Sequence, residues 1–128
     1  MQPRFSLFNT VPSALPLLWN DQGRVQFEEV RKLLDLSKSD FARAARASQK
    51  QMADVLKIPK EIEERVRVWA LVLEEVARFF DGDAKKTALW FNIPNPLLGE
   101  VSPRDMILYG RARKLLQIVR DEISGDVP

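Results

Sequence analysis

Apolar side chains recur at helical spacing over residues 60–80, and this pattern constrains the fold more than any other feature of the chain. Ile62, Val66, Trp69 and Leu73 fall on one face of a helix with 3.6 residues per turn. Further apolar residues widen this face beyond a single stripe, so the helix should be buried from more than one side. The widening residues are Val68, Leu71, Val72 and Phe79, while Val76 or Ala77 and then Phe80 continue the first face. The sequence therefore predicts a long central helix around which the other elements pack.

Shorter helices are expected on both sides of the central helix, and no segment alternates apolar and polar residues as a strand would. Ser39 can cap one of them and Ser48 the next, which stops at Pro59 because proline has no amide donor. The expected helices cover residues 25–34, 41–45, 49–56, 84–91 and 103–123, with an interruption at Gly110. The predicted fold class is therefore all-α.

Composition limits the chemistry that the chain can perform. It contains no His and no Cys, which removes the usual zinc sites, the Ser-His and Cys-His nucleophile pairs and disulfides. Glu74, Glu75, Asp81 and Asp83 are the best candidates for a carboxylate metal site, but they offer too few oxygen ligands at the required spacing. We therefore expect no metal, no cofactor and no enzymatic activity.

A cytoplasmic location fits the sequence best. No apolar run approaches the roughly 18 residues that cross a bilayer. Prolines at positions 3, 12 and 16 interrupt the N-terminal segment where an export signal would lie. The net charge is only +2, but residues 24–60 hold nine Lys or Arg against five Asp or Glu. Such a local basic excess can attract phosphate, and a solvated helix surface is the alternative explanation.

The sequence pattern divides the chain into three parts. An N-terminal arm covers residues 1–23, a helical domain that includes the long connecting helix covers residues 24–80, and a smaller domain with a short tail covers residues 81–128. The arm is apolar and rich in proline, so it should pack against its own chain or against a second copy. A length of 128 residues fits one packed domain or two small ones that share a core.

Residues 36–55 have the spacing of a helix-turn-helix. This motif needs a small residue where the helices cross, a short turn, and apolar anchors on the second helix. Ala42 supplies the crossing, residues 46–48 the turn, and Met52 and Val55 the anchors. The segment resembles the helix-turn-helix of Xre-type repressors without a gap. It departs at Arg46, which stands where the turn usually has Gly and would take a left-handed conformation at some cost.

This resemblance implies that residues 49–56 form the helix that enters the major groove of DNA. Gln can pair with adenine through two hydrogen bonds, and Lys can reach guanine or phosphate. Asp54, on the same exposed side, would be repelled by phosphate. The alternative is a helical hairpin that uses this face for protein contact. The implied DNA contacts are Lys38, Gln49, Lys50, Gln51 and Lys57.

A second pattern extends over residues 82–110, where Trp90 and Phe91 end a helix, a Pro-Asn-Pro turn follows, and Ser102 caps a new helix. Each motif alone is explained as plain structure. In this order and spacing, however, they resemble the toxin-binding C-terminal domain of the Xre/MbcA/ParS family of bacterial antitoxins. Together with the helix-turn-helix, the resemblance covers residues 25–125. It implies a type II antitoxin that covers the active-site entrance of a RES-fold, NAD-consuming toxin.

The family resemblance also implies which residues bind the toxin. Trp90, Leu98 and Ile107 would form an apolar centre, although Trp90 and Ile107 could equally belong to the core. Basic residues of the last helix would contact an acidic rim, and the C-terminal tail would act as a plug. The implied toxin contacts are Trp90, Asn95, Leu98, Arg111, Lys114, Asp126, Val127 and Pro128.

Two functions stay open from the sequence. The first is an antitoxin that binds its toxin and represses its own operon. The second is a stand-alone helix-turn-helix transcriptional regulator whose C-terminal domain binds another protein. A homodimer is expected in either case, because helix-turn-helix proteins pair to match DNA half-sites. The antitoxin would also form a larger hetero-oligomer with the toxin.

Overall fold

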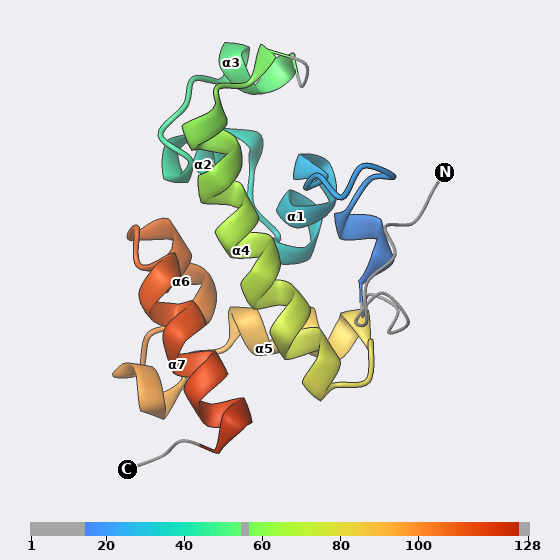
Figure 1. Cartoon of the computed structure of the whole chain (residues 1–128). Helices are drawn as coiled ribbons and strands as arrows, with labels where there is room; N and C mark the ends of the chain where they lie inside the picture. The colour runs from blue at the N-terminus through green and yellow to red at the C-terminus, as the bar shows by residue number, and fades with distance from the viewer. Residues whose placement is uncertain (1–14, 55–56, 126–128) are drawn as a thin grey trace.

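The computed structural model describes residues 15–54 and 57–125, and the regular elements in these ranges are all helical (Figure 1). The prediction of an all-α fold is confirmed. Two isolated β-bridges, between Trp19 and Val25 and between Asn95 and Val101, close short loops. None of the described helices is long and apolar enough to cross a membrane. The elements are η1 (Pro16–Leu18), α1 (Phe27–Leu34), α2 (Lys38–Ala44), α3 (Gln49–Ala53), α4 (Lys60–Phe79), α5 (Ala84–Asn92), η3 (Pro96–Leu98), α6 (Pro103–Leu108) and α7 (Ala112–Ser124).

Helix α4 is the central element, as predicted. Figure 1 shows α1 on one side of it and α6 and α7 on the other, and α4 packs most extensively along α7. Ile62, Val66 and Trp69 on its predicted inward face are buried. Phe79, which the sequence pattern also assigned to the buried surface, is instead 72% exposed. The neighbouring Phe80 packs against the core at this turn, so the ring of Phe79 stays outside it.

Helices α1 and α2 bury the apolar residues that the sequence assigned to their inner faces, among them Val30, Phe41 and Ala42. Helix α2 begins at Lys38, earlier than the expected start at residue 41. The reason is that Ser37 caps the helix instead of Ser39, because the Ser37 hydroxyl accepts a hydrogen bond from the first turn. The expected cap was therefore wrong by two residues.

A short turn, residues 45–48, joins α2 to α3. Arg46 has a φ of 59°, so the left-handed conformation expected at this position is confirmed. The amide of Ala47 donates to the carbonyl of Ala42 across the turn, at 2.9 Å. Helix α3 begins at Gln49 as predicted but ends at Ala53, since Asp54 has extended backbone. The expected extension to residue 56 is thus corrected. Of the two predicted anchors, Met52 is partly buried against the core, and Val55 lies outside the described residues.

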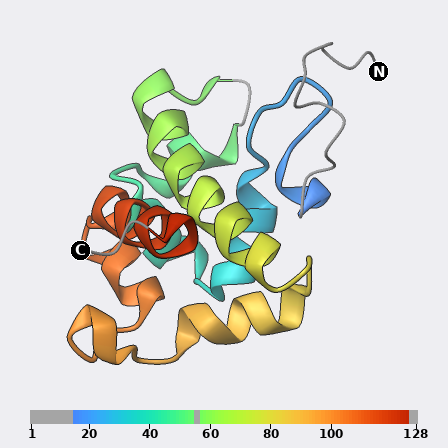
Figure 2. The same ribbon diagram turned by 60° about the horizontal axis from the view of Figure 1, so that its bottom comes forward.

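The C-terminal part folds back against α4. Figure 2 shows α5 along one edge of the molecule, followed by η3, α6 and α7. The side chains of Asp83 and Ser102 cap α5 and α6, each by accepting an amide of the first turn. Gly110, with a φ of 80°, separates α6 from α7 and confirms the expected interruption. Ser124 belongs to α7, whereas the sequence placed it in the free tail.

The described part of the N-terminal arm packs against its own chain. Leu15 and Leu18 are buried in the core. The indole Nε1 of Trp19 donates to a carboxylate oxygen of the buried Glu74 at 3.2 Å, and the guanidinium of Arg67 lies 5.4 Å from the Trp19 ring centroid. Residues 1–14 lie outside the described part of the chain.

A two-point ion pair fastens the loop before α1 to the start of α4. The Nε and Nη2 atoms of Arg24 donate to the two carboxylate oxygens of Glu63 at 2.6 and 2.8 Å. Hydrogen bonding to the charged form lowers the pKa of Glu63 below its ordinary value. The pair is largely solvated on the Arg24 side, so its main effect is to orient the loop.

One hydrophobic core joins the two helical parts that the sequence distinguishes. Its buried members include Val30 and Phe41 from the N-terminal helices, Trp69 and Leu73 from α4, and Leu115 from α7. The boundary between residues 24–80 and 81–128 therefore separates two sequence patterns, but the residues on both sides of it share one core. Because α4 supplies residues to both sides, neither part could keep its apolar face buried without this helix.

Candidate functional site

Two hollows on the protein surface lie along helix α7, one along its second half and the other at its first turn, and together they contain most of the described residues that the sequence nominated for protein binding. The first, which we name the apolar groove, has a volume of about 240 Å³. It lies between the end of α4, the segment from α5 to η3, and the second half of α7. Its lining residues are Val76, Phe79, Phe80, Trp90, Asn95, Leu97, Leu98, Leu115, Ile118, Val119, Glu122 and Ile123.

Several large apolar side chains around the apolar groove are exposed to solvent. Phe79 is 72% exposed, Leu97 78% and Ile123 49%. They come from three separate elements, α4, η3 and α7. The periodicity of a single helix therefore cannot explain why they lie together. Contiguous exposed apolar surface of this kind marks an interaction site more often than scattered single residues do. The groove is therefore the best candidate for a protein-binding surface among the described residues.

Three of the predicted toxin contacts, Trp90, Asn95 and Leu98, meet in the apolar groove. Trp90 and Leu98 are half-buried and pack against the core with part of their surface. The side-chain oxygen of Asn95 accepts the amide of Leu97 at 2.9 Å, and Gly99 ends η3 in the left-handed conformation. The Pro-Asn-Pro turn thereby places Leu97 at the rim of the groove.

Other predicted toxin contacts lie elsewhere. Arg111 and Lys114 line the second hollow, at the start of α7, whereas the apolar groove lies along the second half of this helix. Ile107, the third residue expected in an apolar centre, is only 1% exposed and belongs to the core, which is the alternative the sequence allowed. Asp126, Val127 and Pro128 lie outside the described residues.

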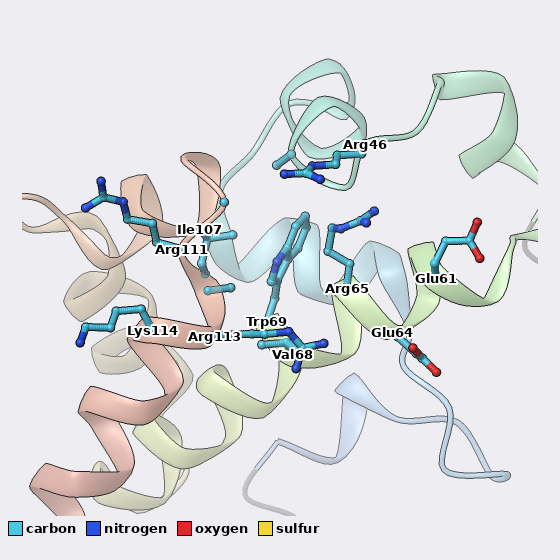
Figure 3. A pocket seen from close by; sticks show the side chains of 13 residues that line it. Arg46, Glu61, Glu64, Arg65, Val68, Trp69, Ile107, Arg111, Arg113 and Lys114 are labelled. Atoms are coloured by element: carbon cyan, nitrogen blue, oxygen red, sulfur yellow. The ribbon is translucent and has the colours of Figure 1, made fainter.

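The second hollow, which we name the basic hollow, has a volume of about 450 Å³. It is bounded by the α2–α3 turn, the first half of α4, and the junction of α6 and α7 (Figure 3). Figure 3 shows Arg111 and Lys114 at one end, Arg46 near Trp69 in the middle, and Glu61 and Glu64 at the other end. Its lining residues are Ala44, Arg46, Glu61, Glu64, Arg65, Val68, Trp69, Ile107, Gly110, Arg111, Ala112, Arg113 and Lys114.

The predicted DNA contacts stand on the outer surface of α2 and α3. Lys38, Gln49 and Lys50 are exposed. Gln51 is exposed too, but its side-chain oxygen accepts the amide of Ser48 at 2.9 Å in a capping box. Lys57 lies 4.0 Å from Asp54, so the carboxylate that opposes DNA binding also neutralises one of the nominated lysines.

The acidic residues considered for a metal site have structural roles instead. Glu74 pairs with Arg78 and Glu75 with Arg120, at 3.4 and 3.3 Å. Asp83 caps α5. Within residues 15–54 and 57–125, no group of three or more acidic side chains is placed to hold a metal ion.

Sequence reasoning missed several residues of both hollows. It assigned Phe79 to the core and did not single out Leu97 or Arg65. Leu97, directly after the Pro-Asn-Pro turn, was an available signal for the groove, but the three elements that form it are distant in sequence. Comparison with known proteins adds no further assignment, because no family model, no curated protein and no solved structure matches this chain.

Proposed function

We propose that this protein is the antitoxin of a type II toxin-antitoxin system and that it seats a RES-type, NAD-consuming toxin on the apolar groove. The sequence pattern of residues 82–110 supports the class of partner. One observation supports the choice of the apolar groove as the binding surface: five large apolar side chains line it. Three of them are exposed, and the residues are Phe79, Leu97, Ile123, Trp90 and Leu98. A toxin that buries this surface would find an apolar centre, with Asn95 and Glu122 as polar groups beside it.

Inhibition in this proposal needs no catalytic group on the antitoxin. A rigid body bound over the active-site entrance excludes NAD by volume alone. The apolar groove suits this role because α4 and α7, which form its walls, pack extensively against each other in the core. Rigid surfaces lose less conformational entropy on binding than flexible ones. The proposed site of action is the cytoplasm, where NAD is consumed.

The proposal is tested by co-expressing the chain with the reading frame beside its gene, followed by copurification and measurement of cellular NAD. Leu97→Asp should weaken the complex at least tenfold and let NAD fall, because a charge replaces an apolar contact in the groove. Leu89→Asp is the matched control, since Leu89 is also an exposed leucine, at 60%, and does not line the groove. Equal effects of the two substitutions, or no binding by the unmodified chain, would refute the proposal.

The tail is tested separately. A chain that ends at Ser124 retains α7 but lacks the predicted plug at residues 126–128. Full inhibition by this truncated chain would dismiss the plug and leave the groove proposal intact. Loss of inhibition with copurification retained would show that the tail blocks the toxin after docking has occurred.

A transcriptional regulator is the second candidate function, and the geometry of α2 and α3 favours it. The left-handed Arg46, the Ser48 capping box and the exposed Gln49 and Lys50 are what a DNA-reading helix-turn-helix would present. In this role the protein would act as a homodimer on paired half-sites. Gln49→Ala with Lys50→Ala should abolish salt-dependent binding to the promoter of its own gene. Gln51 is unsuitable for this test, because its substitution would also remove one of the two hydrogen bonds of the capping box that begins α3.

A further inference from the structure

Among the described residues that line the apolar groove, Glu122 carries the only charge, and none is Lys or Arg. The side chain of Glu122 is exposed and forms no ion pair with any described residue. Most other glutamates of the described ranges are paired with Arg or Lys. They are Glu28, Glu29, Glu63, Glu64, Glu74 and Glu75. The groove therefore holds a negative charge that the fold does not neutralise.

The position of Glu122 within α7 adds to this negative charge. The carbonyl groups at the C-terminal end of a helix carry partial negative charge, which a basic side chain in the last turn offsets. Arg31 does so in α1 and Arg78 in α4, whereas the last turn of α7 contains no basic residue. It contains Asp121 and Glu122 instead. The end of α7 at the groove is thus negative through both its backbone and its side chains.

Exposed apolar side chains lie in the same groove as this carboxylate. Ile123, the neighbour of Glu122 in sequence, is 49% exposed, and Leu97 from η3 is 78% exposed. A partner that buries these apolar side chains also displaces water from Glu122. A carboxylate that loses water without gaining a cation is strongly unfavourable, so the partner must supply a positive group at this place.

We infer that the toxin segment seated in the apolar groove is apolar with a Lys or Arg beside its apolar residues, and that this cation pairs with Glu122. The inference rests on the proposed function, because it specifies the chemistry of the partner at the same groove. It reverses the charge expected from the sequence, which assigned basic residues of this protein to an acidic rim of the toxin. Arg111 and Lys114, the residues given that role, line the basic hollow and not the apolar groove.

The first test measures by calorimetry how the full chain binds the product of the reading frame beside its gene. Glu122→Gln removes the charge but keeps the size of the side chain, and should weaken the complex about fivefold or more. Asp121→Asn is the matched control, with an expected effect within about twofold. Asp121 lies in the same turn, does not line the groove, and accepts a hydrogen bond from Gln117 that asparagine can also accept. Both acidic side chains are exposed, so the fold should survive.

A comparison at Leu97 separates the effect of charge from that of apolar contact. Leu97→Lys and Leu97→Asp remove the same apolar side chain from the groove and introduce opposite charges. A basic partner is repelled by the lysine, which can also neutralise the carboxylate that the partner needs. The Leu97→Lys chain should therefore bind about threefold or more weakly than the Leu97→Asp chain.

A second test does not depend on the toxin. The probes are two peptides blocked at both ends, Lys-Phe-Leu-Lys and Glu-Phe-Leu-Glu, and the NMR signal of the Trp90 indole reports binding in the groove. The net charge of the chain is +2, so attraction by overall charge favours the acidic peptide. We expect the basic peptide to bind about threefold or more tightly instead, and we expect Glu122→Gln to remove this preference.

The possible failures are distinguishable. Weakening by Leu97→Asp without any effect of Glu122→Gln would overturn the inference and leave the apolar groove as the docking surface. Equal effects of Glu122→Gln and Asp121→Asn, or a preference for the acidic peptide, would overturn it as well. If the product of the neighbouring reading frame does not bind the unmodified chain, the proposed function fails, and the peptide comparison alone then supports or overturns the charge preference of the groove.

Discussion

The ring of Phe41 meets the ring of Trp69 edge to face, with 5.2 Å between the ring centroids and 90° between the planes. Phe41 lies on α2 and Trp69 on α4, and both are almost completely buried. This pair joins α2 to the central helix α4. Trp69 also lines the basic hollow, so the same ring supports the floor of a candidate site.

Truncation of Phe41 should therefore destabilise the whole domain. Phe41→Ala removes a buried ring from a packed core and should lower the free energy of unfolding by about 3–5 kcal/mol. Phe41→Leu keeps most of the volume, so the loss should be smaller, about 1–2 kcal/mol. Urea unfolding monitored by tryptophan fluorescence measures both. A loss below about 1 kcal/mol for Phe41→Ala would contradict the packing described for this pair.

Arg46→Gly should stabilise the protein. The left-handed backbone at this residue costs a side-chain-bearing residue about 1–2 kcal/mol, and glycine adopts it freely. Arg46→Ala is the control, because it removes the guanidinium but keeps the Cβ atom that causes the cost. We expect the glycine variant to unfold at a higher temperature than the alanine variant. The reverse order would show that the turn is not strained.

The carboxyl group of Glu63 should titrate below the ordinary range for glutamate, because its charged form accepts hydrogen bonds from Arg24. A folded-state pKa that is lower than the unfolded one stabilises the fold above the unfolded value, and this contribution disappears as pH falls through the folded value. Carbon-detected NMR titration measures the pKa. In Arg24→Gln it should return toward the ordinary value, and an unchanged titration would exclude the pair as the cause.

The exposed residues of the apolar groove should matter little for stability. Phe79→Ser and Leu97→Ser should change the free energy of unfolding by only about 0.5 kcal/mol, because their side chains already stand in water. Leu115→Ala, a fully buried residue below the same groove, should cost about 2–5 kcal/mol. Thermal unfolding of the isolated chain distinguishes the two classes. A large loss in Phe79→Ser would mean that the groove is covered by part of the chain itself.

Local signals determined most of the helices. The spacing of Ile62, Val66 and Trp69 predicted α4, and Gly110 predicted the break before α7, because periodicity and glycine act within a few residues. Capping was less certain. Ser37 and Ser39 are both residue types that cap helices. In the structure Ser37 caps α2, and the path of the chain between the end of α1 and this residue decides the choice.

The candidate sites required the tertiary structure. The sequence nominated Trp90, Asn95 and Leu98, which do meet in one groove, but it grouped Arg111 and Lys114 with them although these line a separate hollow at the start of α7. It placed Phe79 in the core, because a helical pattern records that a residue is apolar and not whether another element covers it.

The sequence by itself thus determined the all-α class and the central helix, since both follow from interactions between residues close along the chain. The left-handed conformation of Arg46 was expected only from the resemblance to Xre-type repressors, whose turn usually has Gly at this position. Only the tertiary structure decided which apolar residues stay exposed. The apolar groove and the basic hollow each combine segments that are distant in sequence, and the packing of α7 against α4 is what brings those segments together.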